Sequence, residues 1–224
     1  MAQRSLRKRL WYKFLHMLCR LGAVLFFRAR VSGQEFIPAT GGALVLSNHQ
    51  SHLDPVLVGM ACHRRLNYLA RQTLFDIAPL RWLIRSLDAI PIDRAGTGLG
   101  GLKETLKRLK HEEMVLIFPE GTRTRDGELA RFKPGFVALA RRANVPLLPV
   151  GLDGAYQAWP RSRKLPRRGV VRIVFGPPLL PAEMAQLNDD ELVRELEQRT
   201  LACFLQARQG RAAAVGRASQ KNCS

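Results

Sequence analysis

Acidic residues are scarce in this chain. Its 224 residues include 18 Asp and Glu against 36 Lys and Arg, which gives a formal net charge of +18. Such an excess indicates an anionic partner: nucleic acid, a membrane surface or a phosphorylated substrate. Aromatic residues make up only 7% of the chain and it contains no nucleic-acid recognition motif, so no nucleic-acid partner is expected. A non-enzymatic basic protein that binds nucleic acid or membranes remains an alternative.

Paired cysteines are also missing. The four thiols lie far apart with no C-x-x-C spacing; they are Cys19, Cys62, Cys203 and Cys223. This pattern excludes a disulfide framework and a cysteine-based zinc site, and it is typical of reduced thiols in a cytosol-facing protein. The sequence has no H-E-x-x-H motif either. We therefore expect no metal.

Residues 1–30 carry a basic, amphipathic pattern at helical spacing. On a helical wheel one sector is apolar and contains Trp11, Phe14, Leu15, Leu18, Leu21 and Leu25. The opposite sector is basic and contains Arg9, Lys13, His16 and Arg20. A cation at a bilayer centre costs about 2.5–3.5 kcal/mol. We therefore expect a helix in the headgroup region on the cytoplasmic face of the cell membrane, peripheral or monotopic. An amphipathic helix that merely covers the core is the alternative.

Beyond residue 30, short apolar runs alternate with helical patterns. Strands are expected at 43–46, 68–70, 89–92, 114–118, 147–150 and 170–175. Helices are expected at 55–62, 102–110, 135–142 and 189–206, with a broken one within 74–87. This alternation predicts one α/β domain over residues 31–206, with a largely parallel or mixed central sheet flanked by helices. Residues 207–224 lose the apolar periodicity, which predicts a disordered basic tail.

A histidine and an aspartate follow the first apolar run, with four residues between them. On a regular helix His49 and Asp54 would point about 140° apart, so they can meet only in a turn between strand and helix. Pro55 suits a first helical position and Asp54 an N-cap, which predicts such a turn. An imidazole held by a carboxylate can take a proton from a hydroxyl near neutral pH. The alternative is that Asp54 only caps the helix and His49 only fills the turn.

Charged residues follow two further strands. Asp93 and Arg94 follow one, and the other continues into Phe118-Pro119-Glu120-Gly121-Thr122-Arg123-Thr124. Lys133 precedes an expected helix, whose first N–H groups favour an anion. Charge-assisted hydrogen bonds from arginine to phosphate are worth about 1.5–3 kcal/mol each. Cations at several strand ends therefore indicate a phosphate-bearing substrate.

Together these segments resemble the 1-acyl-glycerol-3-phosphate (lysophosphatidic acid) acyltransferase family of glycerolipid acyltransferases. Four blocks occur in that family's order: Asn48-His49 through Asp54, Ile92-Asp93-Arg94, Phe118 through Arg123, and Val145-Pro146-Leu147-Leu148-Pro149-Val150. Two positions depart from the pattern, with Pro91 where an apolar residue is commoner and Thr124 where Ser is usual.

The resemblance implies a glycerol-3-phosphate acyltransferase-like fold and an O-acyltransferase without a cofactor. An acyl group would pass from acyl-CoA or acyl carrier protein to the free hydroxyl of a lysophospholipid, giving phosphatidic acid from 1-acyl-glycerol-3-phosphate. His49 would be the general base and Asp54 would hold its imidazole. The implied substrate-binding residues are Arg94, Glu120, Gly121, Thr122, Arg123 and Lys133.

Two other enzyme classes have partial support in the sequence. Gly96-x-Gly98-x-x-Gly101, with Glu120 at the end of the next strand, fits a dinucleotide-binding fingerprint and favours an NAD(P)-dependent oxidoreductase. That hypothesis leaves His49, Asp54 and the arginines without a role. A metallohydrolase would use His49, His52, Asp54 and His63, a set that matches no zinc pattern.

Overall fold

The computed structural model describes residues 6–71, 90–92, 99–163 and 165–221. Within these ranges seven strands form one mixed sheet in the order β1-β7-β6-β2-β5-β3-β4. Their bounds are β1 Arg30–Ser32, β2 Ala43–Ser47, β3 Leu66–Arg71, β4 Ile90–Ile92, β5 Met114–Ile117, β6 Leu147–Asp153 and β7 Arg172–Phe175. Strands β6, β2, β5, β3 and β4 are mutually parallel, whereas β7 runs antiparallel to β6 and pairs with β1 in parallel. The predicted α/β fold with a largely parallel or mixed sheet is confirmed.

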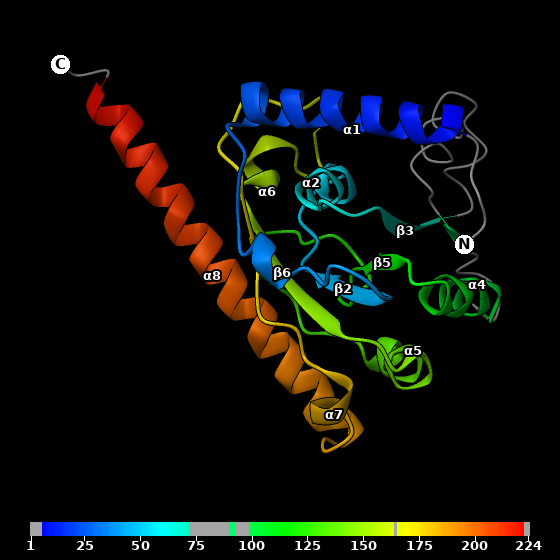
Figure 1. Ribbon diagram of the computed structural model, residues 1–224. Coiled ribbons are helices and arrows are strands. Elements are labelled where there is room, and N and C mark those ends of the chain that lie inside the picture. Colours follow the sequence, from blue (N-terminus) through cyan, green and yellow to red (C-terminus); the bar gives the residue numbers. More distant parts are fainter. Residues whose placement is uncertain (1–5, 72–89, 93–98, 164, 222–224) are drawn as a thin grey trace.

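Helices cover both faces of the sheet (Figure 1). One layer consists of α1 (Leu6–Phe27), α2 (Asp54–Ala61) and α6 (Ala155–Ala158). The other consists of α4 (Leu99–Lys110), α5 (Val137–Ala143), α7 (Pro181–Met184) and α8 (Asp189–Lys221). Two short 3-10 helices, η1 (Gln34–Phe36) and η3 (Pro134–Phe136), complete the described elements.

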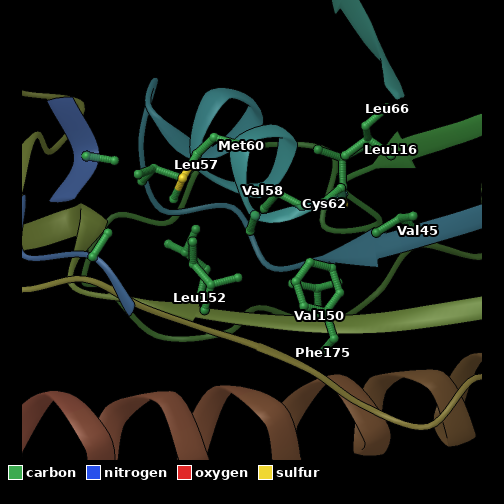
Figure 2. Packing of buried hydrophobic residues seen from close by; sticks show 14 of the residues in the cluster. Val45, Leu57, Val58, Met60, Cys62, Leu66, Leu116, Val150, Leu152 and Phe175 are labelled. Atoms are coloured by element: carbon green, nitrogen blue, oxygen red, sulfur yellow. The ribbon is translucent and has the colours of Figure 1, made fainter. Parts of the chain in front are cut away.

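The central strands are buried on both sides, which is why they read as continuous apolar runs in the sequence. Along β2, Ala43 and Val45 pack toward α1 and α2, whereas Leu44 and Leu46 pack toward α4, α5 and α8. Figure 2 shows the first of these clusters, where residues of α2 face Val45, Leu116 and Val150 of the sheet. Strands β2, β5 and β6 are thus firmly held, and the turns that follow their carboxyl ends meet at one edge of the sheet.

Most predicted elements are present with shifted ends. Strand β6 continues three residues past the expected end, and α4 begins three residues before the expected start. Strand β1 and the short helices α6 and α7 were not predicted, because each is too short for a helical period and contains no continuous apolar run. The broken helix expected within 74–87 lies outside the described residues.

The predicted disordered tail is wrong, because α8 continues to Lys221. Alanine and arginine, which dominate this stretch, are strong helix formers. Small residues let the helix approach the sheet closely: Ala207 is fully buried, and a Cβ at Gly151 of β6 would collide with the backbone of Cys203 and Phe204. A helix held by small residues and ion pairs carries no leucine periodicity, so the sequence pattern missed it.

Helix α1 confirms the helix predicted within residues 1–30. Ala23 and Phe27 are buried against the core beside α2. Eight large apolar side chains of the helix are exposed: Trp11, Phe14, Met17, Leu18, Leu21, Val24, Leu25 and Phe26. Nowhere in the described chain does a helix reach the length and apolar character that a bilayer crossing requires.

Candidate active site

His49 and Asp54 meet in the turn between β2 and α2. His49 Nδ1 lies 2.7 Å from Asp54 Oδ2, which confirms the predicted strand–turn–helix geometry. The predicted N-cap role of Asp54 is wrong by one position, since Leu53 flanks the helix and Asp54 is its first residue. The carboxylate turns back toward the strand instead of forward along the helix.

The Asp54 carboxylate organises this turn from a fully buried position. Its Oδ2 accepts hydrogen bonds from the backbone N–H groups of Gln50 (2.6 Å) and Ser51 (2.7 Å) as well as from the His49 ring. Hydrogen bonds to an ionised acceptor are roughly twice as strong as neutral ones. One oxygen therefore fixes both the path of the turn and the orientation of the imidazole.

The His49 ring is held but still accessible. It stacks on Phe118 with ring centroids 3.9 Å apart, and 19% of its side chain is exposed. Because a carboxylate only accepts hydrogen bonds, the contact with Asp54 places the ring hydrogen on Nδ1. Nε2 then carries the lone pair. This arrangement can take a proton from a nearby hydroxyl and stabilise the imidazolium that results.

The main chain of His49 is bound by the segment that follows β5. Its N–H donates to Glu120 Oε1 (2.7 Å), and its carbonyl accepts from the Thr124 N–H (2.8 Å). Glu120 Oε2 also accepts from the Ala130 N–H at 3.2 Å. The resemblance implied a substrate-binding role for Glu120; the structure gives it bracing contacts to the His49 turn.

Burial raises the pKa of Glu120 to about 7, and the charges of Asp54 and Asp126 act in the same direction. The two backbone N–H donors, from His49 and Ala130, oppose this effect without cancelling it. Partial desolvation, followed by the nearby charges of Arg123 and His49, lowers the pKa of His52, while Asp54 acts in the opposite direction.

The raised pKa of Glu120 predicts a specific pH dependence of stability. The folded protein binds this proton more tightly than the unfolded chain, so the contribution is complete below pH about 4.5 and is lost as the pH rises through about 7. The loss is at most about 3 kcal/mol. Glu120→Gln cannot ionise, so urea denaturation from about pH 5 to about pH 8 should show the variant gaining stability relative to wild type as pH rises. A pH-independent difference would contradict the assignment.

The structure describes four of the other five predicted binding residues. Gly121 adopts φ +74° and Lys133 packs over it, so that a Cβ there would lie 3.3 Å from Lys133 Nζ. Thr122 is exposed, and Arg123 is half-buried and close enough to His52 to influence its pKa. These residues are thus brought to the strand end that braces His49. Arg94 lies outside the described residues.

Sequence reasoning missed two buried amides beside His49. The Asn48 side chain pairs with the backbone of Leu152 through both its atoms, at 2.9 and 2.8 Å, and so extends the pairing of β2 with β6. The Gln50 side chain donates to Gly127 O at 2.8 Å. Both residues are fully buried. Polar side chains directly after a buried strand were the available signal.

Neither alternative enzyme class fits this geometry. Among the described residues no three His, Cys, Asp or Glu side chains gather as metal ligands would, so the set His49, His52, Asp54 and His63 is not assembled. In a dinucleotide-binding unit the acid ends the strand next to the one before the glycines. Here β3 separates β4 from β5, and both Glu120 oxygens accept backbone N–H groups. Gly96 and Gly98 fall outside the described ranges, and Gly101 lies within α4.

Comparison with known proteins identifies the class. Residues 28–153 match the family model for acyltransferases, a stretch that contains the whole His49–Asp54 turn and the Glu120 segment. The chain belongs to this acyltransferase family.

Two relatives and one crystal structure are similar to this chain over most of their length. The chain is 30% identical over 181 residues to a 1-acyl-sn-glycerol-3-phosphate acyltransferase of Bacillus subtilis, covering 80% of this chain and 88% of that one. A Pseudomonas aeruginosa protein of the same name is 33% identical over 196 residues, covering 86% and 72%. The crystal structure of the 1-acyl-sn-glycerophosphate (LPA) acyltransferase PlsC from Thermotoga maritima superposes with a TM-score of 0.78 at 28% identity, covering 91% of this chain and 82% of that one.

Proposed function

We propose that this protein is a 1-acyl-glycerol-3-phosphate O-acyltransferase. It transfers a fatty acyl group from a thioester, acyl-CoA or acyl carrier protein, to the free hydroxyl of lysophosphatidic acid and forms phosphatidic acid. The 2.7 Å contact between His49 and Asp54 carries the proposal, because it provides a base for a hydroxyl acceptor. The names of the Bacillus and Pseudomonas relatives support the choice of acceptor.

The reaction proceeds by direct attack. His49 Nε2 takes the proton of the glycerol hydroxyl as its oxygen attacks the thioester carbonyl. The C–S bond then breaks, and the departing thiolate takes the proton back from the imidazolium. Asp54 stabilises that imidazolium, and general-base assistance of this kind contributes about 10²–10⁴-fold. Burial raises the pKa of Cys62 to about 12 and that of Cys203 to about 11, which makes both thiols poor nucleophiles for an acyl-enzyme.

The phosphate of the acceptor binds at the end of β5. Lys133 packs over Gly121 there, Arg123 is close enough to His52 to influence its pKa, and Thr122 is exposed beside them. A forked guanidinium and a point-charge ammonium together suit a phosphate monoester. We assign Arg94 to the same role from the sequence pattern.

A matrix of donors and acceptors tests the proposed function. Purified protein in lipid vesicles is given acyl-CoA or acyl carrier protein together with lysophosphatidic acid, glycerol-3-phosphate or a lyso-ornithine lipid, and products are identified by mass spectrometry. The proposal predicts phosphatidic acid from lysophosphatidic acid. Acylation of another acceptor in its place would overturn the substrate assignment.

We propose that helix α1 binds the cytoplasmic face of the cell membrane. Its exposed apolar residues form a strip on which Met17 is 63% exposed and Leu25 70%. A continuous apolar surface of this kind marks a contact site, and exposed arginines beside it, Arg28 and Arg168, suit anionic headgroups. The segment from Trp159 to Gly169 joins this strip to the catalytic turn, since Ser51 Oγ donates to Trp159 O and the Gly169 N–H donates to Phe26 O.

Charged residues in the strip should release the protein from vesicles. Burial of a leucine side chain stabilises by about 1.5–3 kcal/mol, so Leu18→Glu with Leu25→Glu should weaken binding to vesicles of anionic phospholipid at least tenfold. Co-sedimentation measures this binding. The matched control is Leu201→Glu with Leu205→Glu, two exposed leucines of α8. Equal loss of binding in both double variants would contradict the role of α1.

A further inference from the structure

The C-terminal half of α8 sends two arginines toward the catalytic turn. Arg208 and Arg211 lie on the stretch beyond residue 206, and both fall outside the region that matches the acyltransferase family model. Gly154, with φ +101°, leaves room for one of them: a Cβ there would lie 2.9 Å from Arg211 Cδ. Both guanidinium groups lie close to a single carboxylate at the end of β6.

That carboxylate is Asp153, which is fully buried. Arg211 Nε donates a hydrogen bond to its Oδ2, and Arg208 Nε lies 4.0 Å from its Oδ1. A buried carboxylate needs such partners, because an unpaired charge in the interior is strongly destabilising. The two arginines therefore offset the cost of burying the Asp153 carboxylate and hold its side chain from the side of α8.

Asp153 is in turn connected to the catalytic turn through Gln50. The Gln50 amide nitrogen lies 3.5 Å from Asp153 Oδ1, and its amide oxygen accepts from the Tyr156 N–H at 3.3 Å. The backbone N–H of the same Gln50 is one of the three donors to Asp54 Oδ2. A shift of the Gln50 side chain would therefore also move the Gln50 backbone N–H, which helps to hold Asp54 Oδ2 in contact with His49.

A second route runs through Arg208. Its Nη2 donates to Glu128 Oε1 at 2.7 Å, and this hydrogen bond raises the pKa of Arg208. Glu128 belongs to the same loop as Gly127, whose carbonyl accepts from Gln50, and Thr124, whose N–H donates to the His49 carbonyl. Helix α8 thus contacts both loops that hold His49.

We propose that Arg208 and Arg211 are positioning residues for the acyl transfer. Through Asp153, Gln50 and Glu128 they set the His49–Asp54 turn, so that the last turns of α8 form part of the machinery of the site although they touch no substrate. This inference rests on the proposed function. A displacement of about 1 Å at a catalytic group can cost 10²-fold in rate, so a remote ion pair of this kind has a measurable effect on turnover.

The test is kinetic and uses the full chain. Arg211→Gln and Arg208→Gln remove each charge, and Arg211→Lys restores it without the forked geometry. Arg199→Gln is the matched control, because the carboxylates that Arg199 pairs with, Glu195 and Glu183, lie on α8 and α7 and not on the two loops. For every variant kcat and KM for both substrates are measured at a temperature well below its own melting midpoint.

Arg211→Gln should lower kcat by about 10–100-fold and leave both KM values within about threefold of wild type, since ground-state binding does not use these residues. Arg211→Lys should regain most of the lost turnover, Arg208→Gln should show a smaller loss of kcat, and Arg199→Gln should match wild type. If Arg211→Gln does not fold, Arg208→Gln decides by the same split between kcat and KM.

A normal kcat in folded Arg211→Gln, or a loss that appears only in KM, would overturn the positioning role and leave the proposed function intact. Failure of both glutamine variants to fold would also overturn it, because structural support would then be a sufficient account. A wild-type protein that transfers no acyl group would instead refute the proposed function.

Discussion

Replacing His49 by alanine should lower the turnover of acyl transfer by about 10²–10⁴-fold, because the variant loses the proposed general base. The fold should survive. The ring is partly exposed, and the Asp54 carboxylate keeps its two backbone donors, Gln50 and Ser51. The melting temperature from circular dichroism and the rate of phosphatidic acid formation measure the two effects separately.

His52→Ala is the control for His49→Ala. His52 occupies the same turn, but its ring lies against Trp159, with centroids 5.4 Å apart, whereas the His49 ring is the one that contacts Asp54 Oδ2. Removal of His52 should leave a turnover close to that of wild type. A well-folded His49→Ala protein with near-normal turnover would show that another group takes the proton.

Asp54→Asn is expected to produce the second large effect. The amide oxygen can still accept from Gln50 and Ser51, so the turn should persist, but a neutral group no longer stabilises the imidazolium. Turnover should fall by about 10²–10⁴-fold. Asp54 Oδ1 is buried with no hydrogen-bond partner among the described residues, so an amide nitrogen placed there would cost about 1–3 kcal/mol of stability.

Asp189→Asn offers the comparison for Asp54→Asn. Asp189 is an exposed carboxylate that pairs with Arg141 at the surface, a type of contact worth about 0–1 kcal/mol. The control should change neither turnover nor the free energy of unfolding appreciably. Normal turnover in folded Asp54→Asn would mean that orientation of the ring, and not the charge, is what Asp54 supplies.

The sequence predicted the His49–Asp54 turn because that turn is local. His49, Asp54 and Pro55 lie within seven positions after a buried strand, and backbone geometry alone excluded a continuous helix. The central strands were equally accessible to prediction, since burial on both faces of β2 and β5 gives uninterrupted apolar runs.

Contacts across the fold were beyond sequence reasoning. Glu120 binds the His49 N–H across 71 positions, and Asn48 pairs with Leu152 across 104. Nothing in the local pattern indicates which backbone group a buried side chain will reach. The structure therefore adds a bracing role for Glu120 to the substrate-binding role that the resemblance implied.

The prediction for the end of α8 was wrong for a different reason. Its packing depends on Ala207, on the absence of a side chain at Gly151, and on the ion pair between Arg211 and Asp153. None of these produces a periodic apolar signal. A stretch rich in arginine, alanine and glycine therefore resembles a disordered tail until its partners on β6 are known.

Thiol release from acyl-CoA by the purified protein tests the proposed base chemistry most directly. One reaction contains lysophosphatidic acid, and a second contains an analogue in which hydrogen replaces the free hydroxyl. We expect the wild-type protein to form thiol and phosphatidic acid in equal amounts in the first reaction. Thiol release should be near background in the second reaction and with His49→Ala. Release with the hydroxyl-free analogue, together with an acyl group on the protein detected by mass spectrometry, would contradict direct attack assisted by His49.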